Sequence, residues 1–477
     1  MPGPAPGYAD ASGEGYAHVD ENALVAVADA PRSTFAIDVD TASMSNVRRF
    51  LEDGQLPPAD AVRVEEMINY FDYAYPEPTG DVPFAVVAEA GPSPFHADRR
   101  LIHLGLQGRH IADADLPRRN LIFLIDTSGS MTAADKLPLL KQGMSLMVER
   151  LTARDRVGIV AYAGSVGVVL PPTTADHKDE ILAAIARLES GGSTNGAGGI
   201  QTAYQLAREH FDAGGINRVL LATDGDFNVG VSSQDGLVEL IEQERDSGVY
   251  LTVLGFGTGN LQDAKMEALA DHGNGNYGYI DSAAEARKLL VEQAGGTLVT
   301  IAKDVKVQVE FDPAQVASYR LIGYENRVMA AEDFRDDAKD AGELGAGHTV
   351  TALYEVEPAA GATAGAPLAT LRLRYVPPTG GETRELAAPI VDDGATLATT
   401  SADFRFAAGV AGFGMLLRGS ANLGDATWAS VRALAAGGAA GDGDASGRRT
   451  QLVALIDTAA RLAGADAGAG ATTKVAR

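Results

Sequence analysis

Apolar runs alternate with stretches of helical apolar spacing through the middle of the chain, between residues 118 and 301. The first run, Leu121–Ile125, has no polar alternation, which is typical of a strand buried on both faces of a parallel sheet. Similar runs follow at 156–162, 218–223 and 250–256. The stretches with helical spacing are 137–151, 177–188, 198–210, 237–247, 261–271 and 283–295. Alternation with short links predicts a doubly wound, mostly parallel α/β sheet.

Strand-like runs of another kind flank this region on both sides. Two of them precede it, at 84–88 and 101–106, and the four that follow it are 305–311, 319–323, 348–356 and 368–375. We expect the two sets to pair in one β-sandwich. The α/β domain is then an insertion, and both of its ends leave the same face of the sheet.

Helical spacing returns near both ends of the chain. Helices are predicted at 44–51 and 63–71, after an alternating strand that begins at Ser33. Asp40 or Thr41 is expected to cap the first of them. Three more helices are predicted near the other end, and we expect them to pack with the N-terminal pair: 403–417, 427–436 and 450–462.

These patterns divide the chain into six parts. The ends are rich in Gly, Ala and Asp and carry no sustained period, so we predict that they lack fixed structure. The predicted parts are a flexible tether at 1–30, an N-terminal helical segment at 31–80, a discontinuous β-sandwich at 81–117 with 302–392, the α/β domain at 118–301, a C-terminal helical region at 393–464 and a disordered tail at 465–477.

Oxygen-bearing side chains follow the first buried strand directly. Asp126, Ser128 and Ser130 form a D-x-S-x-S turn at the strand's carboxyl end, where open α/β sheets place their ligands. Such a turn alone is also made by ordinary helix caps and turns. Two later segments fit the same site, namely Gly191–Asn195 and the strand at 219–223 that ends in Asp224. Hard oxygen donors of this kind suit Mg²⁺ or Mn²⁺.

Five residues in this order and strand context resemble the metal-ion-dependent adhesion site of von Willebrand factor type A (VWA) domains. They are Asp126, Ser128, Ser130, Thr194 and Asp224. The resemblance implies a Rossmann-like VWA fold that binds Mg²⁺, with Mn²⁺ or Ca²⁺ as alternatives. It also implies that the hydroxyl residues ligate the ion directly and the two aspartates largely through water. A partner's Glu or Asp would complete the octahedron.

Other segments resemble the YfbK-like group of bacterial VWA proteins. These segments are 46–50, 65–71, 255–260, 323–327 and 403–408, and they extend the resemblance over nearly the whole chain beyond the tether. Proteins of this group commonly begin with an exported lipoprotein signal whose cysteine carries lipid. The resemblance therefore implies a place in the cell envelope, periplasmic or at the surface. This sequence contains no such cysteine, so a lipid anchor is an expectation for the native precursor only. A cytoplasmic assembly factor that acts with an AAA-type ATPase is the alternative.

Composition limits the remaining possibilities. Acidic residues number 64 and basic residues 39, a balance that opposes binding to nucleic acid through long-range repulsion. The absence of cysteine excludes disulfides, thiol catalysis and thiolate metal sites. No apolar stretch has the length of a membrane span. We therefore expect a protein partner, with no nucleic acid and no direct membrane span.

Enzyme motifs are missing from the sequence. The eight histidines do not form an H-E-x-x-H zinc pattern, and Ser128 does not lie in a G-x-S-x-G turn. The glycines between Gly255 and Gly259 do not spell a dinucleotide-binding motif. A metal-dependent hydrolase would need a general base, and none is identified. The prediction is a non-enzymatic protein-binding or adhesion module; its partner, resident ion and oligomeric state stay open.

Overall fold

The computed structural model describes residues 14–38, 40–112, 114–192, 196–225, 234–259, 261–293, 298–337, 339, 341–439 and 444–465. Its contacts divide the chain into two compact units. The first contains residues 1–18 and 111–299, and the second contains residues 19–110 and 300–477. The main part of the first unit, residues 111–299, overlaps the α/β domain predicted at 118–301, and residues 1–18 join it.

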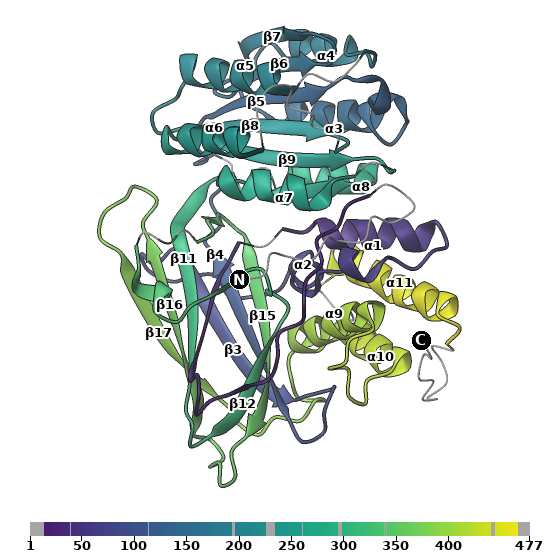
Figure 1. Ribbon diagram of the computed structural model, residues 1–477. Coiled ribbons are helices and arrows are strands. Elements are labelled where there is room, and N and C mark those ends of the chain that lie inside the picture. The colour runs from purple at the N-terminus through teal and green to yellow at the C-terminus, as the bar shows by residue number, and fades with distance from the viewer. Residues whose placement is uncertain are drawn as a thin grey trace. The chain divides into compact units, whose positions relative to one another are not determined.

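A six-stranded sheet forms the centre of the first unit (Figure 1). Its order is β10 (Tyr277–Ile280), β9 (Tyr250–Phe256), β8 (Ile216–Thr223), β5 (Arg119–Asp126), β6 (Arg156–Tyr162) and β7 (Val166–Thr174). All neighbours are parallel except β7, which runs antiparallel to β6 at the edge. Every residue of β5 is buried, and because successive side chains point to opposite faces, both faces are covered. The predicted doubly wound sheet is confirmed; β7 and β10 had no predicted counterpart.

Helices connect these strands, as the apolar spacing predicts, except that β7 follows β6 directly. The helices are α3 (Leu137–Arg150), α4 (Lys178–Ala186), α5 (Gly196–Glu209), α6 (Gln234–Asp246), α7 (Asp263–His272) and α8 (Ala283–Arg287). A 3₁₀ turn, Gly129–Thr132, follows β5. The helix α8 continues as a π-helix at Lys288–Gln293.

The second unit contains two antiparallel sheets. One has the order β1 (Val25–Ala26), β12 (Val316–Ile322), β15 (Thr349–Pro358), β4 (Arg100–Gly108) and β3 (Phe84–Pro92). The other has the order β13 (Val328–Met329), β2 (Arg32–Ala36), β11 (Thr300–Phe311), β16 (Pro367–Val376) and β17 (Arg384–Val391), with β14 (Leu344–Gly345) beside β11. Because β4 pairs with β15, strands from both sides of the insertion share one sheet.

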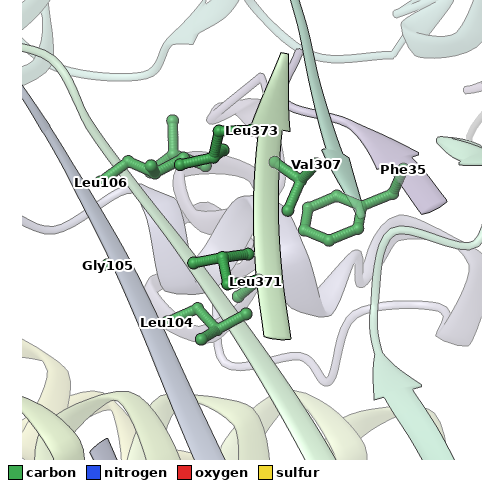
Figure 2. Close-up of a pocket in the computed structure, with 9 residues that line it drawn as sticks. Phe35, Leu104, Gly105, Leu106, Val307, Leu371 and Leu373 are labelled. Carbon is green, nitrogen blue, oxygen red and sulfur yellow. The ribbon is translucent and has the colours of Figure 1, made fainter. Parts of the chain in front are cut away.

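Apolar side chains of the two sheets meet in the interior of the sandwich. Figure 2 shows Phe35 and Val307 from one sheet facing Leu104 and Leu106 from the other around a small pocket. The full lining is Phe35, Leu104, Gly105, Leu106, Val307, Val350, Ala352, Leu371 and Leu373. No polar side chain lines this pocket, so it belongs to the hydrophobic core and offers no group that would orient a ligand.

The described part of the predicted tether is packed instead of free. Tyr16 is buried, and Gly15 forms a parallel bridge with Gln262 in the first unit. Further along, Val25 pairs with Tyr319 in the second unit. The prediction of a flexible segment over 1–30 is wrong for residues 14–27, because sheet edges supply backbone partners that composition does not reveal. The predicted disordered tail lies outside the described residues from 466 onward.

The segment 31–80 also differs from its prediction, since it is not helical throughout. Its strand β2 is an inner strand of the sandwich, between β13 and β11. The helices α1 (Ala42–Glu52) and α2 (Val64–Asn69) follow, with the 3₁₀ turn Ala59–Ala61 between them. The sandwich therefore recruits a strand from ahead of the predicted boundary at residue 81.

Five helices of the second unit share one core with the sandwich. Of the C-terminal helices, α9 (Ala402–Arg418) packs against α2 and α11 (Arg448–Leu462) packs against α1, while α10 (Trp428–Ala439) packs against α9 and α11 (Figure 1). Met67, Phe406 and Ile456 are completely buried there. The predicted packing of the two chain ends is confirmed. Among the described residues, no helix is both long and apolar enough to cross a membrane.

Candidate metal centre

The loop after β5 places three of the predicted ligands together. Asp126 is completely buried, and its Oδ1 accepts a hydrogen bond from the Ser128 backbone N–H at 2.8 Å. The hydroxyl oxygens of Ser128 and Ser130 lie 2.9 Å apart. This turn forms because the carboxylate at the strand end satisfies the backbone donor that follows it, as in other Asx turns. Its oxygen atoms therefore gather at the carboxyl end of the strand.

The glycine segment ahead of Thr194 lies against this loop. The Gly129 N–H donates to the Gly192 carbonyl at 3.2 Å, and the Gly191 N–H donates to the Thr127 carbonyl at 2.7 Å. These two hydrogen bonds join the segments in the way that the predicted site requires. Thr194 itself lies outside the described residues, so its place in the site stays a prediction.

Asp224 follows β8, the parallel neighbour of β5. It is completely buried, and the preceding Thr223 donates a hydrogen bond from its hydroxyl to Asp126 Oδ2 at 3.3 Å. Asp224 Oδ2 accepts a hydrogen bond from Lys136 Nζ at 2.9 Å, whereas its Oδ1 has no partner within the described residues. Two loops that are 98 residues apart in sequence thus bring both carboxylates to one edge of the sheet.

Burial disfavours the ionised forms of the acidic groups at this edge of the sheet. Burial raises the pKa of the Asp126 carboxyl, and the neighbouring charge of Asp224 raises it further, although hydrogen bonds from Ser128 and Thr223 act in the opposite direction. Burial and the charge of Asp126 also hold the pKa of the Tyr162 phenol well above its usual range. A buried acid with a raised pKa is stabilised when a cation approaches it. The edge of the sheet therefore favours a bound positive charge.

The side chains that the structure brings together fit a hard divalent ion. Two carboxylates and two hydroxyls are the donors that Mg²⁺, Mn²⁺ or Ca²⁺ prefer, and Asp224 Oδ1 is a buried acceptor that no other described residue satisfies. Asp126, Ser128, Ser130 and Asp224 would hold the ion. Among the described residues no cluster of three or more His, Asp or Glu side chains could hold a metal, so this candidate depends on its hydroxyl groups.

Sequence reasoning missed Lys136. It lies just ahead of α3 and its side chain is 9% exposed, with Nζ on Asp224. The sequence shows only a lysine at the start of a predicted helix, a position that usually faces solvent. Its contact with a residue 88 positions away depends on how the strands are ordered. No local pattern could have identified it.

Family models match three parts of the chain. The model described as von Willebrand factor type A domain matches residues 120–293, which include the loops after β5 and β8. The model described as Uncharacterized protein YfbK, C-terminal, matches residues 296–462. A third model, described as von Willebrand factor, matches residues 10–103. Together the matches span most of both units.

Individual proteins are similar to different extents. The chain is 42% identical over 468 residues to the Escherichia coli (strain K12) protein described as Uncharacterized protein YfbK, covering 93% of this chain and 80% of that protein. It is 29% identical over 176 residues to Homo sapiens inter-alpha-trypsin inhibitor heavy chain H3, covering 35% of this chain and 20% of that protein. The solved structure of von Willebrand factor type A from Catenulispora acidiphila is 16% identical with a TM-score of 0.47, covering 79% of this chain and 89% of that chain.

Proposed function

Because the chain belongs to the YfbK-like family of proteins with a VWA domain, we propose that it is a non-enzymatic module that captures a protein partner through a metal site. Proteins with VWA domains are generally protein-interaction or adhesion modules and generally non-enzymatic. The finer proposal concerns the edge of the sheet at β5 and β8. There, a Mg²⁺ ion would be held, with Mn²⁺ or Ca²⁺ as alternatives.

One observation carries this proposal. Asp126 and Asp224 are both completely buried at the ends of neighbouring parallel strands, and one oxygen of Asp224 has no hydrogen-bond partner among the residues that the structure describes. Buried carboxylates without enough donors are costly unless a cation is present. The Ser128 and Ser130 hydroxyls beside them add neutral oxygen donors. This donor set supports metal binding and does not require catalysis.

The residues of the site would hold the ion and fix the geometry of its ligands, and none of them would transfer a proton. Asp126 fixes the turn through the Ser128 N–H, and that turn holds the Ser128 and Ser130 hydroxyls toward each other. Asp224 supplies charge from the next strand. When bound, Mg²⁺ supplies an electrophilic centre that accepts a carboxylate oxygen from a Glu or Asp of the partner. No nucleic acid is required in this proposal.

A pull-down from the native organism tests this function. Immobilised full-length protein is incubated with lysate in Mg²⁺ and, in parallel, in EDTA, and the Asp126→Ala variant is treated in the same way. We expect a protein that is retained in Mg²⁺ and is lost both in EDTA and with Asp126→Ala. The matched control is Asp176→Ala, which removes an exposed carboxylate between β7 and α4 in the same unit. Retention that is unchanged in EDTA contradicts the proposal.

We place this activity in the bacterial cell envelope, with a lipid anchor in the native precursor. The support is the resemblance to YfbK-like proteins, which commonly begin with a lipoprotein signal. Fractionation of the native organism with an antibody against this chain tests the location. Recovery with the envelope fraction is the expected result. Recovery in the cytoplasm together with an AAA-type ATPase would favour the alternative of an assembly factor.

A further inference from the structure

Lys136 contacts the candidate metal centre through Asp224. Its Nζ donates to Asp224 Oδ2 at 2.9 Å, and its side chain is 9% exposed while that of Asp224 is fully buried. A lysine ammonium is normally solvated, so withdrawing it from water is costly unless the position has a use. The lysine therefore supplies one positive charge inside a site that is otherwise acidic.

The fold makes room for this lysine at one glycine. Gly257 follows β9 and has a φ of +71°, a conformation that favours glycine. A Cβ at this position would lie 2.0 Å from Lys136 Cε and 2.5 Å from its Cγ. The lysine stem thus lies directly against the backbone of Gly257. Any larger residue there would have to displace it.

Neighbouring groups hold this glycine loop in place. The buried Tyr279 on β10 donates a hydrogen bond from its hydroxyl to the Gly257 carbonyl at 2.9 Å. On the other side of the loop, the Gly259 N–H donates to Glu14 Oε1 at 3.0 Å. Strands β8, β9 and β10 therefore contribute Asp224, Gly257 and Tyr279 to one arrangement that directs Lys136 toward Asp224. Because groups from three strands fix its position, the Lys136–Asp224 pair differs from an ion pair at the surface.

We propose that Lys136 is a built-in counterion of Asp224 that weakens divalent metal binding and leaves the loaded site positively charged. The inference rests on the proposed function and gives a physical reason for its preference for a carboxylate. Two carboxylates alone would neutralise a divalent ion. With the lysine present, the loaded site keeps a net positive charge, and a carboxylate from the partner neutralises it. An anionic side chain is thereby preferred over a neutral one such as Gln or Asn.

Unpaired Asp224 Oδ1 distinguishes this role from simple structural pairing. The lysine hydrogen bonds to Oδ2, and Oδ1 stays without a partner in the described part of the chain. A purely structural ion pair would be expected to leave no buried acceptor unsatisfied. Lys136 holds the carboxylate by one oxygen, so the other oxygen remains for the ion or its water.

Metal titration of the full chain tests the first half of the inference. Mn²⁺ is titrated into metal-free wild type and Lys136→Met, and the dissociation constant is measured by calorimetry. We expect Lys136→Met to bind Mn²⁺ at least fivefold more tightly, because a repelling charge is removed. Lys136→Gln serves as a second neutral variant, and Lys136→Arg, which keeps the charge, should stay near wild type.

The matched control is Lys141→Met on α3, the helix that begins directly after Lys136. Lys141 donates to the Ala186 and Leu188 carbonyls, away from the predicted ligands, so its loss changes the net charge of the chain equally without touching the site. We expect no change in Mn²⁺ affinity for this control. An equal increase in both variants would mean that general charge, and not the position of Lys136, is responsible, and this would overturn the inference.

Acetate tests the second half as the simplest carboxylate. It is titrated into the Mn²⁺-loaded proteins, and binding is followed by the relaxation of water protons near the ion. Acetate should bind the loaded wild type at least threefold more tightly than loaded Lys136→Met. Equal acetate affinity would overturn the preference for anions. Folding of each variant is checked by circular dichroism.

The outcomes separate this inference from the proposed function. If wild type binds Mn²⁺ and both neutral variants bind it equally or more weakly, the inference is wrong and the metal site stands. If only the neutral variants bind Mn²⁺, the lysine does oppose the ion, but the proposed function and the positively charged loaded site of wild type are overturned. If no protein in the series binds Mn²⁺, both the proposed function and the inference are overturned.

Discussion

Two buried acids in this protein have opposite electrostatic surroundings. Glu355 on β15 is completely buried. Its carboxylate accepts hydrogen bonds at 2.7–3.3 Å from four side chains, those of Ser93, His96, Arg99 and Arg320. Burial alone would raise its pKa, but the hydrogen bonds from Ser93 and His96 and the charge of Arg320 lower it. The carboxylate of the sandwich is thus compensated entirely by its own fold.

Asp126 is equally buried but is not compensated in this way. Its hydrogen bonds with Ser128 and Thr223 involve neutral groups, and Asp224 adds a second negative charge nearby. The pKa of Asp126 is therefore raised where that of Glu355 is lowered. The two acids are equally buried but have opposite pKa shifts. The charge of Glu355 is compensated by groups of the sandwich, which we call the closed site. The charge of Asp126 at the edge of the α/β sheet is not, so this open site can accept an external cation.

Breaking the closed site should have the largest effect. Glu355→Gln leaves Arg320, which is 3% exposed, beside a neutral group, so we expect a loss of about 3–5 kcal/mol in the free energy of unfolding. Urea denaturation at pH 7 measures it. The control is Glu385→Gln, which removes a carboxylate from the more exposed pairs with Arg335 and Arg372 and should cost about 0–1 kcal/mol. Equal losses for both variants would contradict the comparison.

The second-largest effect should come from adding a divalent ion, which should stabilise the protein through the open site. If Mg²⁺ binds the folded chain alone, an Mg²⁺ concentration 100 times the dissociation constant adds about 2.7 kcal/mol to the free energy of unfolding. Asp126→Ala should show no such gain. Thermal unfolding with Mg²⁺ and with EDTA measures the difference, and Asp176→Ala is the control that should respond like wild type. A wild type whose stability does not respond to Mg²⁺ would contradict metal binding at this edge of the sheet.

Glu325 offers an intermediate case within the second unit. Burial raises its pKa to about 7, with a further contribution from the charge of Glu65, although Arg418 opposes the shift. The pKa of Glu325 is higher in the folded chain than in the unfolded chain. Its contribution to stability is therefore fully present at pH values below the unfolded-state pKa and is lost as pH rises through about 7. Glu325→Gln should therefore gain about 2 kcal/mol relative to wild type between pH 5 and pH 8. A difference that is independent of pH, in parallel urea titrations, would contradict this.

The smallest effect is expected from Asp126→Asn in EDTA. The amide keeps an acceptor for the Ser128 N–H and removes a charge whose pKa is raised in the fold, so the free energy of unfolding at pH 7 should change by about 1 kcal/mol or less, toward higher stability. As pH falls, wild type should approach the variant, since Asp126 becomes protonated more readily in the folded chain. A marked destabilisation by this variant would show that the metal-free site needs the charge.

Much of the fold follows from local patterns. The strand limits at 156–162 and 250–256 agree with β6 and β9, because buried parallel strands have continuous apolar runs. Strand β7 was missed because its residues are partly exposed at the sheet edge, and its apolar run is interrupted by Pro171 and Pro172. At the start of α1, the Ser43 N–H donates to Glu66 of α2 at 2.9 Å, and Thr41 makes no side-chain cap. Composition near a helix end cannot reveal a capping group from another helix.

The sequence alone determined that polar loops follow buried strands and that Asp126, Ser128, Ser130 and Asp224 belong to the same edge of a parallel sheet. Such information is local, because a strand and the turn that ends it are written in consecutive residues. Tertiary structure decided that β8 lies next to β5, that Lys136 reaches Asp224 past Gly257, and that β2 enters the sandwich. Those contacts join residues far apart in sequence, and their free energy depends on which elements become neighbours when the chain folds.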